Sequence, residues 1–314
     1  MPRDYLHNRP DFADLIRIVA AAQRIDPALV EKDYWIMHGL YGLQQMGMSF
    51  ELKGGTSLSK GYGIIERFSE DIDIRIEPPP ARPVAAGRNQ NKPAHVDSRR
   101  NFYDWLAATI HIDGFVEAIR DTAFDDDRYR SGGIRLVYDS FNEPISGLKP
   151  GVLLEVGFDD VTPNRPCVIS SWAYDYAAQQ VEIVDNRAFD IACYDPSYTL
   201  VEKLQTISTK YRKQQETGEM PANFLRHYYD VYCLLRRKEV QEFIGTKDYL
   251  DHKAKRFRIA DNPNIAANPA YLLPNPEIRR QYEAAYVQTR TLYYREQPAF
   301  ADILAMIAAH TARL

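Results

Sequence analysis

The chain has 314 residues, 45% of them hydrophobic, and a formal net charge of −4 at pH 7. This length is enough for two domains, or for one large domain with a substantial core. The negative net charge excludes a protein that binds nucleic acid through an overall basic surface, so any contact with RNA must come from local basic patches.

The first elements in chain order are two predicted helices, over residues 11–24 and 27–45. The first has an amphipathic pattern, and a proline stands at the first turn of the second, a position that suits it. A strand end at 50–53, a Gly-Gly turn, a short helix over 56–65 and a strand over 72–76 follow. Charged and apolar residues alternate in this last strand, as they do in a sheet with one buried face.

The most informative segment joins a Gly-Gly-Thr-Ser turn to an Asp-x-Asp pair, at Gly54, Gly55, Thr56, Ser57, Asp71 and Asp73. Glycines let a backbone approach phosphates closely, and a helix N-terminus beyond them favours negative charge. Alternate strand residues point the same way, so the two carboxylates repel each other unless a cation lies between them. Such oxygen ligands suit Mg²⁺ or Mn²⁺. The segment therefore predicts phosphate chemistry on metal ions.

Each part of this segment has a simpler interpretation when it is taken alone. A Gly-Gly pair is commonly a plain turn, and an Asp-x-Asp pair is commonly a solvated strand face. The order of strand, turn, helix and strand favours the functional interpretation. The chain contains neither the Gly-x-Gly-x-x-Gly pattern nor the Walker A pattern, so it lacks the signatures of a dinucleotide fingerprint and of a P-loop.

Beyond the Asp pair, a proline-rich insertion over 78–96 lacks any apolar period. A helix capped by Ser98 is predicted to run to about residue 121. Strands are predicted at four places, over 128–138, 151–158, 181–184 and 189–193. From residue 197 onward the pattern is helical, with a loop and two closing helices, over 262–276, 277–294 and 298–313.

Residues 54–74 read GGTSLSKGYGIIERFSEDIDI, and three more segments accompany them: 30–40 (VEKDYWIMHGL), 198–210 (YTLVEKLQTISTK) and 226–235 (RHYYDVYCLL). Together they resemble the Glu-Lys-Asp-Tyr helix and the three motifs of the AbiEii-type toxins of type IV toxin–antitoxin systems, in the nucleotidyltransferase superfamily. They span about residues 27–236 in the family's order. In the second motif the family usually has Ala and Arg where this chain has Thr206 and Lys210.

The resemblance implies an α+β fold, in which a nucleotidyltransferase-type mixed sheet is flanked by helices and followed by a mainly helical C-terminal region. We therefore expect a nucleotidyltransferase core domain with N-terminal helices over residues 1–196. A helical C-terminal domain over 197–314 is expected to complete the active site.

The resemblance also implies roles for individual residues. Asp71 and Asp73 would hold two divalent cations, which lie ~3.5–4 Å apart in such sites. Glu155, a single acid in the apolar strand 151–158, is the candidate third carboxylate beside them; the alternative is an edge-strand residue that faces water. Lys203 would contact the triphosphate, and Asp230 would complete the catalytic set.

The expected nucleotide-binding set comprises Gly54, Gly55, Thr56, Ser57, Lys60, Arg67 and Lys203. Arg67 has a simpler alternative, as a surface residue paired with Glu70. Three residues of the second motif are of lower rank, namely Glu202, Lys210 and Arg212, the last of which could replace the family's arginine.

The implied activity is metal-dependent transfer of a nucleoside monophosphate from an NTP to a hydroxyl, with release of pyrophosphate. Mg²⁺ or Mn²⁺ would be the cofactor, and RNA would be the acceptor, as the tRNA 3′ end is for some members. The protein would act as the toxin of a phage-defence (abortive infection) system, with a separately encoded antitoxin. A small-molecule, antibiotic-type transferase and a non-catalytic nucleotide- or protein-binding member of the fold are the alternatives.

Two basic stretches are candidate RNA contacts, over 252–258 (HKAKRFR) and over 279–295, where arginines and tyrosines interleave. Tyr282 and Tyr286 stand four residues apart, which is also typical of a helix packing face.

The three cysteines lie far apart, at positions 167, 193 and 233, and form no Cys-x-x-Cys motif. Such spacing argues against a disulfide framework or a zinc site and indicates a reducing compartment. The sequence has no run of eighteen apolar residues and no signal-peptide pattern at its N-terminus. We therefore expect a cytoplasmic protein that does not enter a membrane.

Overall fold

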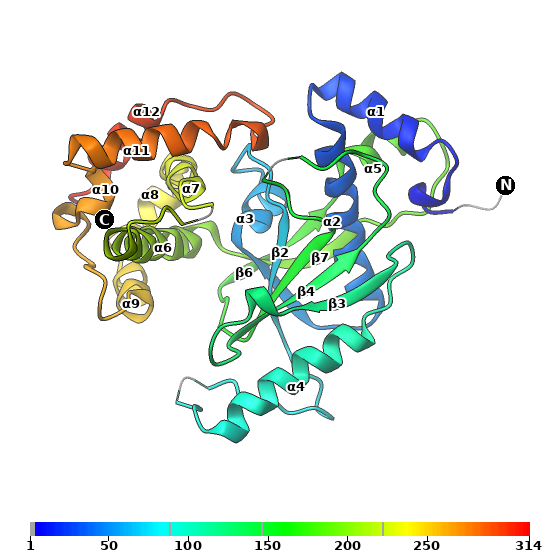
Figure 1. Cartoon of the computed structure of the whole chain (residues 1–314), viewed down its shortest axis with the longest axis horizontal. Helices are drawn as coiled ribbons and strands as arrows, with labels where there is room; N and C mark the ends of the chain where they lie inside the picture. Colours follow the sequence, from blue (N-terminus) through cyan, green and yellow to red (C-terminus); the bar gives the residue numbers. More distant parts are fainter. Residues whose placement is uncertain (1–3, 88, 146, 222) are drawn as a thin grey trace. The chain divides into compact units, whose positions relative to one another are not determined.

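The computed structural model describes residues 4–87, 89–145, 147–221 and 223–314 (Figure 1). The chain divides into two compact units, of which the first contains the chain up to Tyr62 together with Ser69–Tyr194. The second unit contains Gly63–Phe68 and Asp195–Leu314. No helix among the described residues is long and apolar enough to cross a membrane.

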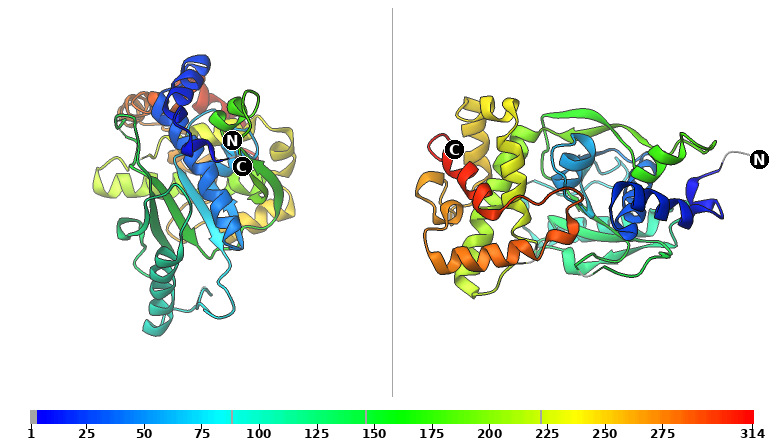
Figure 2. Two further views of the ribbon diagram at one scale, coloured as in Figure 1. Left: turned by 90° about the vertical axis from the view of Figure 1, so that its right-hand side faces the viewer. Right: turned by 90° about the horizontal axis from the view of Figure 1, so that it is seen from above.

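In the first unit, helices and strands alternate irregularly along the chain. Its helices are α1 (Phe12–Gln23), α2 (Pro27–Gln45), α3 (Gly54–Thr56), α4 (Pro93–Thr109) and α5 (Trp172–Ala177), with short turns at Leu6–Asn8, Ser57–Gly61 and Thr122–Phe124. Its strands are β1 (Phe50–Lys53), β2 (Asp71–Ile76), β3 (Glu117–Asp121), β4 (Ser131–Val137), β5 (Val152–Gly157), β6 (Asn164–Ile169) and β7 (Ala188–Tyr194). Helices α1 and α2 pack against each other in the N-terminal part of this unit (Figure 2).

These strands form one seven-stranded sheet in the order β3-β4-β5-β2-β1-β7-β6. The pairs β2–β5 and β1–β7 are parallel, and the other neighbours are antiparallel. The sheet is therefore mixed, as expected from the sequence. Strand β2 lies at its centre, with β1 on one side and β5 on the other.

One face of the sheet is covered by two helices of the first unit. Gly39 of α2 lies against the side chains of Ile72 and Leu136, and Tyr103 of α4 lies against Gly132. Gly132 and Leu136 are four residues apart on β4, so both point to the same face. The buried isoleucines of β2 therefore point toward the helices, and the alternating Asp71, Asp73 and Arg75 point to the opposite face.

Helix α2 is the most buried helix of the first unit. Asp26 caps it by accepting a hydrogen bond from the backbone N–H of Ala28 at 2.9 Å, and Pro27 occupies the first turn. Its burial extends to Glu31, Lys32 and Asp33, each only 1% exposed. A helix with buried charges on several sides must supply each of them with a partner.

The expected strands at 128–138, 151–158 and 189–193 are confirmed as β4, β5 and β7. The expected helix from Ser98 to about 121 is confirmed only in its first part: α4 starts earlier, at Pro93, and ends at Thr109, and residues 117–121 form strand β3 instead. No regular structure forms over 181–184, and the edge strands β3 and β6 were not expected. The short helix expected over 56–65 ends at Gly61.

The second unit is mainly helical, as predicted. Its helices are α6 (Pro196–Thr217), α7 (Arg226–Leu235), α8 (Lys238–Phe243), α9 (Lys247–Arg256), α10 (Pro269–Leu272), α11 (Pro276–Val287) and α12 (Phe300–His310), with short turns at Ile265–Ala267 and Arg290–Leu292. Asp195 caps α6 through the backbone N–H of Ser197 at 2.8 Å, and Gly218, at φ +74°, ends it.

Tyrosines fill much of the core between these helices. Tyr282 and Tyr286 of α11 are 0% and 1% exposed, and the hydroxyl of Tyr282 donates to Gln214 at 3.2 Å. The two residues are thus a packing face, and the interpretation of this pair as a stacking platform for RNA is wrong. The aromatic rings reside in the core because α11 packs against its neighbours through that face.

Candidate functional site

Asp73 stands at the centre of a row of three charged residues on neighbouring strands. Lys53 of β1 is its register partner on one side, and Glu155 of β5 is its register partner on the other. Asp71 lies two residues earlier on β2 and points to the same face. Three carboxylates and one lysine therefore share the face of the sheet that α2 and α4 leave free.

The glycine turn lies directly against this row. Gly54 has a φ of +72°, and a Cβ placed on it would stand 3.0 Å from Cγ of Asp73 and closer still to Oδ2. Only glycine combines this left-handed backbone with so close an approach. The Gly-Gly pair therefore fixes the turn onto the Asp73 carboxylate, a connection that the sequence alone did not reveal.

Thr56 and Ser57 are fully buried, at 0% exposure. The Thr56 hydroxyl donates to the backbone carbonyl of Asp71, so it ties the turn to the start of β2. In this structure the hydroxyl holds the turn, and a direct phosphate contact by Thr56 or Ser57 stays a prediction.

The shared carboxylate face raises the proton affinity of its members. Burial, together with the charges of Asp73 and Asp71, raises the pKa of Glu155 to about 8, against the opposing charges of Lys149 and Lys53. Burial also raises the pKa of Asp71 to about 6, against the opposing charge of Lys149. Like charges in a partly buried place disfavour each other's ionisation, and a cation relieves this effect.

Lys149, which the sequence did not single out, supplies a cation at this position. Its Nζ lies 3.0 Å from Oδ1 and 2.8 Å from Oδ2 of Asp71, and 4.5 Å from the centre of the Phe124 ring. Its backbone N–H donates to Glu70 at 2.8 Å, and its carbonyl accepts from Lys32 at 2.6 Å. The backbone is held on both sides, so the ammonium is directed at Asp71.

The donor chemistry of this face fits a hard divalent cation. Asp73 and Glu155 are register partners on paired strands, Asp71 lies beside them, and carboxylate oxygens are the preferred ligands of Mg²⁺ and Mn²⁺. In the part of the chain that the structure describes, no three His, Cys, Asp or Glu side chains yet converge as a metal site. The Lys149 ammonium gives a physical reason, because it neutralises Asp71 where a metal ion would.

The buried charges of α2 hold the loops around this face. Glu31 accepts hydrogen bonds from the Ser140 hydroxyl at 2.8 Å and from the Asn142 amide at 2.7 Å. Lys32 donates to the carbonyl of Lys149, and its Nζ lies 3.5 Å from Glu70. The Glu-Lys part of the segment VEKDYWIMHGL therefore positions the loop that carries Lys149.

Asp33, the next residue of α2, binds the helical turn that follows the glycines. Its carboxylate lies 2.7 Å from Nζ of Lys60 and accepts the backbone N–H of Trp172 at 2.9 Å. Lys60 also stands 5.1 Å from the Trp172 ring. Lys60, an expected nucleotide ligand, is thus paired with Asp33 in this structure, and its phosphate role stays a prediction.

In the second unit, Arg67, Lys203 and Asp230 form one buried cluster. Nε and Nη2 of Arg67 donate to the two oxygens of Asp230, both at 2.7 Å, and Nζ of Lys203 lies 2.9 Å from Oδ2. Arg67 is 4% exposed, so its alternative interpretation as a surface residue is wrong. Two cations share one carboxylate, so these three side chains carry one net positive charge.

The electrostatics of Asp230 follow from this cluster. Burial favours protonation of its carboxyl, but the charges of Arg67 and Lys203 outweigh that effect and hold its pKa well below the usual range. Burial, with the nearby charges of Lys203 and Lys210, lowers the pKa of His227 well below its ordinary value. His227 is therefore neutral at pH 7 and adds no charge to the cluster of Arg67, Lys203 and Asp230.

The chain matches a family model over residues 36–306, and the model describes the nucleotidyl transferase AbiEii toxin of type IV toxin–antitoxin systems. The chain belongs to this AbiEii family. Family membership assigns it nucleotidyl transfer within a type IV toxin–antitoxin system. The resemblance seen in the four sequence segments is thereby confirmed.

No curated protein matches the chain. Among solved structures it is similar to the crystal structure of an antigenic nucleotidyltransferase-like protein from Paracoccidioides brasiliensis. The two share 12% sequence identity over 88% of this chain and 93% of that chain, with a TM-score of 0.33.

Within this AbiEii chain, the structure groups the predicted residues into two sets. Asp71, Asp73 and Glu155 share one face of the sheet in the first unit, and Arg67, Lys203 and Asp230 are joined in the second. Arg212, the candidate substitute for the family's arginine, pairs with Asp261 at 2.9 Å and with Glu216 at 3.0 Å. Sequence reasoning missed Lys53, Lys149 and the contacts of 31–33, because lone lysines and helical charges are normally solvated residues.

We expect Gly54→Ala to lower transfer by two orders of magnitude or more and to lower the free energy of unfolding. The left-handed backbone costs an alanine about 1–2 kcal/mol, and the methyl group also displaces the Asp73 carboxylate from its place. Activity assays and thermal denaturation measure the two effects.

Gly47→Ala is the matched control, because Gly47 has the same φ of +72° and no atom within 4 Å of a Cβ placed there. This variant should lose the same free energy of unfolding that the left-handed backbone costs an alanine, and it should retain its transfer activity. Equal activity losses in both variants would contradict a special role for the Gly54–Asp73 approach.

Proposed function

We propose that this AbiEii chain transfers a nucleoside monophosphate from an NTP to a hydroxyl of RNA, with release of pyrophosphate, as the toxin of its system. A tRNA 3′ end is the acceptor that we propose, and Mg²⁺ or Mn²⁺ is the proposed cofactor. The observation that carries the proposal is the alignment of Asp71, Asp73 and Glu155 on one face of β2 and β5, with the glycine turn against Asp73.

In this proposal the three carboxylates hold the metal ions. Bound metal would lower the pKa of the acceptor hydroxyl and offset the charge of the triphosphate and of the leaving pyrophosphate. The turn that begins at Gly54 would present its backbone to the phosphates, since it places a helical N-terminus beside Asp73.

The cations of the chain would complete the neutralisation of the triphosphate. Lys203 and Arg67 share one carboxylate, and in this proposal the net positive charge of the cluster would attract phosphate oxygens. Asp230 would orient both cations without contacting the substrate. Lys53, in register with Asp73, is a further candidate for the phosphates in the first unit.

The decisive experiment incubates the purified protein with total RNA, Mg²⁺ and each labelled NTP in turn, followed by fractionation of the RNA by size. We expect label from at least one nucleotide to enter RNA of tRNA size, and no label with Asp71→Ala. Absence of label with every nucleotide, together with equal growth inhibition by the wild type and Asp71→Ala, would contradict the proposal.

Lys149 gives a prediction about metal binding that is independent of turnover. We expect Lys149→Gln to bind Mg²⁺ several-fold more tightly than the wild type, because the metal no longer displaces an ammonium from Asp71. Isothermal titration calorimetry of the nucleotide-free protein measures the affinity.

Lys92→Gln is the control for this experiment, since it removes the same charge from an exposed position of the same unit. Its Mg²⁺ affinity should stay within twofold of the wild type. Unchanged or weaker Mg²⁺ binding by Lys149→Gln would refute competition between the lysine and the metal.

A further inference from the structure

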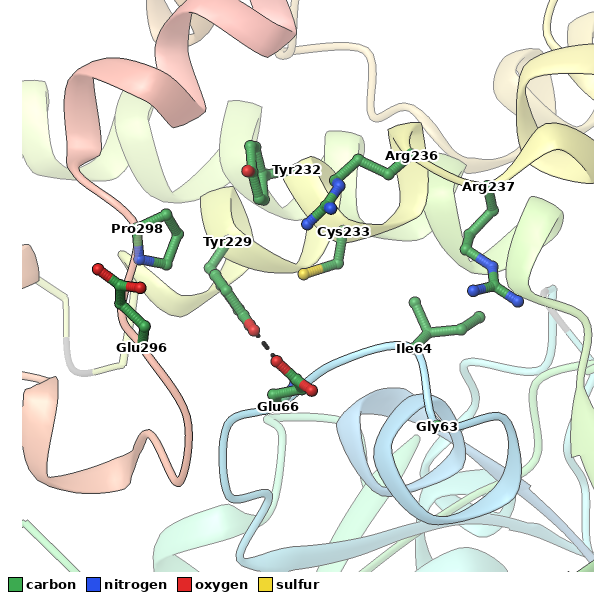
Figure 3. A pocket seen from close by; sticks show the side chains of 10 residues that line it. All are labelled: Gly63, Ile64, Glu66, Tyr229, Tyr232, Cys233, Arg236, Arg237, Glu296 and Pro298. Atoms are coloured by element: carbon green, nitrogen blue, oxygen red, sulfur yellow. Dashed lines mark hydrogen bonds between the residues drawn. The ribbon is translucent and has the colours of Figure 1, made fainter.

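A pocket of about 460 Å³ lies within the second unit, and its lining includes Glu66 and Tyr229, the chain neighbours of Arg67 and Asp230. Its walls come from the segment 63–66, from α7 and the residues after it, and from the segment 296–298 (Figure 3). Tyr229 projects from α7 toward Glu66, and Cys233 of α7 and Arg236, the residue that follows this helix, also line the pocket (Figure 3). Its volume is in the range of sites that hold small ligands or single groups of larger ones.

Arg236 and Tyr232 form the characteristic pair of this pocket. The guanidinium carbon of Arg236 stands 5.4 Å from the centre of the Tyr232 ring. In the described residues no carboxylate lies within ion-pair distance of Arg236, whereas the neighbouring Arg237 lies 3.4 Å from Glu239. An exposed, unpaired guanidinium over an aromatic ring is suited to a phosphate beside a stacked base.

Two tyrosines give the pocket an aromatic wall. Tyr229 and Tyr232 are neighbours on α7, with ring centres 6.5 Å apart and planes inclined by 26°. The Tyr229 hydroxyl is fixed, because it accepts the backbone N–H of Glu66 at 3.1 Å. The more exposed Tyr232 therefore offers its ring to a ligand, while Tyr229 holds the opposite segment in place.

The remaining polar groups narrow the class of ligand. Glu66 and Glu296 line the pocket opposite the arginines, so a ligand with several carboxylates would be repelled. Their oxygens accept hydrogen bonds from ribose hydroxyls and from the amino groups of bases. Burial raises the pKa of the Cys233 thiol to about 12, so this side chain is a neutral wall rather than a nucleophile.

We propose that this pocket binds one nucleotide of single-stranded RNA, with the base against Tyr232, the phosphate on Arg236 and hydrogen bonds to Glu66 or Glu296. The inference rests on the proposed RNA acceptor and names the place where the acceptor strand is held. It differs from the basic stretches found in the sequence, since Arg236 and Arg237 belong to neither of them. A single nucleotide fits this volume, whereas a duplex does not.

The test measures binding of a fluorescent single-stranded oligoribonucleotide by anisotropy, in EDTA and without NTP, so that no transfer is required. We expect Arg236→Gln and Tyr232→Ala each to weaken binding about tenfold, with melting temperatures close to the wild type. The slope of log affinity against log salt should fall by about 0.7 in Arg236→Gln, because one phosphate contact is lost.

Arg280→Gln is the matched control, since Arg280 is 74% exposed on α11 and belongs to one of the basic stretches. Its affinity for RNA should change by less than twofold. The pocket proposal would be contradicted if Arg236→Gln kept the RNA affinity of the wild type, or if Arg280→Gln lost more affinity than Arg236→Gln. Either result would still be compatible with RNA as the acceptor.

Two further outcomes separate this inference from the proposed function. If the wild type binds no RNA, the proposed acceptor fails and the pocket proposal fails with it. If millimolar NTP displaces RNA from the wild type, and Arg236→Gln loses affinity for NTP as much as for RNA, the pocket holds the donor nucleotide and the inference is overturned.

Discussion

Asp73→Ala should abolish nucleotidyl transfer, with a loss of roughly a thousandfold or more. Asp73 lies at the centre of the row formed with Lys53 and Glu155, and it carries the carboxylate against which the Gly54 turn is packed. Without this carboxylate the metal ions stabilise the charge of the transition state less well, by several kcal/mol. Each ~1.4 kcal/mol of lost stabilisation lowers the rate tenfold. Incorporation of label from NTP into RNA is the measurement.

The same variant should fold normally. Removing one of three like charges relieves the repulsion that raises the pKa of Glu155, so the metal-free protein loses little or no stability. Asp127→Ala, which changes an exposed carboxylate of the same unit, should match the wild type in activity and melting temperature. A drop of many degrees in the melting temperature of Asp73→Ala would show that Asp73 has a structural role instead.

Asp230→Asn should lower the free energy of unfolding by about 3–5 kcal/mol and remove most of the activity. The substitution leaves the guanidinium of Arg67 and the ammonium of Lys203 buried without the carboxylate that holds both. Breaking a buried pair by removing one partner is strongly destabilising, because the uncompensated charge has lost its hydration. Chemical denaturation measures the stability, and Asp251→Asn, in an exposed pair on α9, is the control.

The pH dependence provides an independent check on this cluster. The folded pKa of Asp230 is held below its unfolded value, so the stability contributed by its charge is fully present above the unfolded pKa of about 3.9. It is lost only as the pH falls through the lower folded value. The stability difference between the wild type and Asp230→Asn should therefore be constant between about pH 5 and pH 8. A difference that shrinks in this range would mean that Asp230 titrates there and is not held by two cations.

Local patterns predicted much of the fold. The alternation in 71–76 and the apolar run in 151–158 gave the two central strands, because side chains on a strand alternate between faces whatever the rest of the chain does. The edge strands β3 and β6 were missed, since half-exposed strands carry polar residues and a weak pattern. Helix α4 was misplaced because Ser98 looks like a cap, whereas Pro93 sets the actual start.

The sequence predicted individual residues of the candidate site, but not the contacts between them. The glycines and aspartates stand out because their spacing along the chain carries the chemistry. Lys149 does not, since it lies 78 residues from Asp71 and has no motif of its own. Arg67 was expected to serve phosphate or a nearby glutamate, yet its partner is Asp230, 163 residues away. When two ion-pair partners lie so far apart in the sequence, the packing of the helices, strands and loops that carry them determines which side chains meet.

By itself, the sequence determined the family, the mixed α+β architecture and the carboxylates of β2, because periodicity and motif spacing are properties of contiguous residues. Only the tertiary structure decided that Lys149 neutralises Asp71, that Gly54 packs on Asp73 and that Arg67 is buried on Asp230. The physical reason is that a charge removed from water must be paired with whichever group the fold brings within reach, and that group can lie anywhere in the chain.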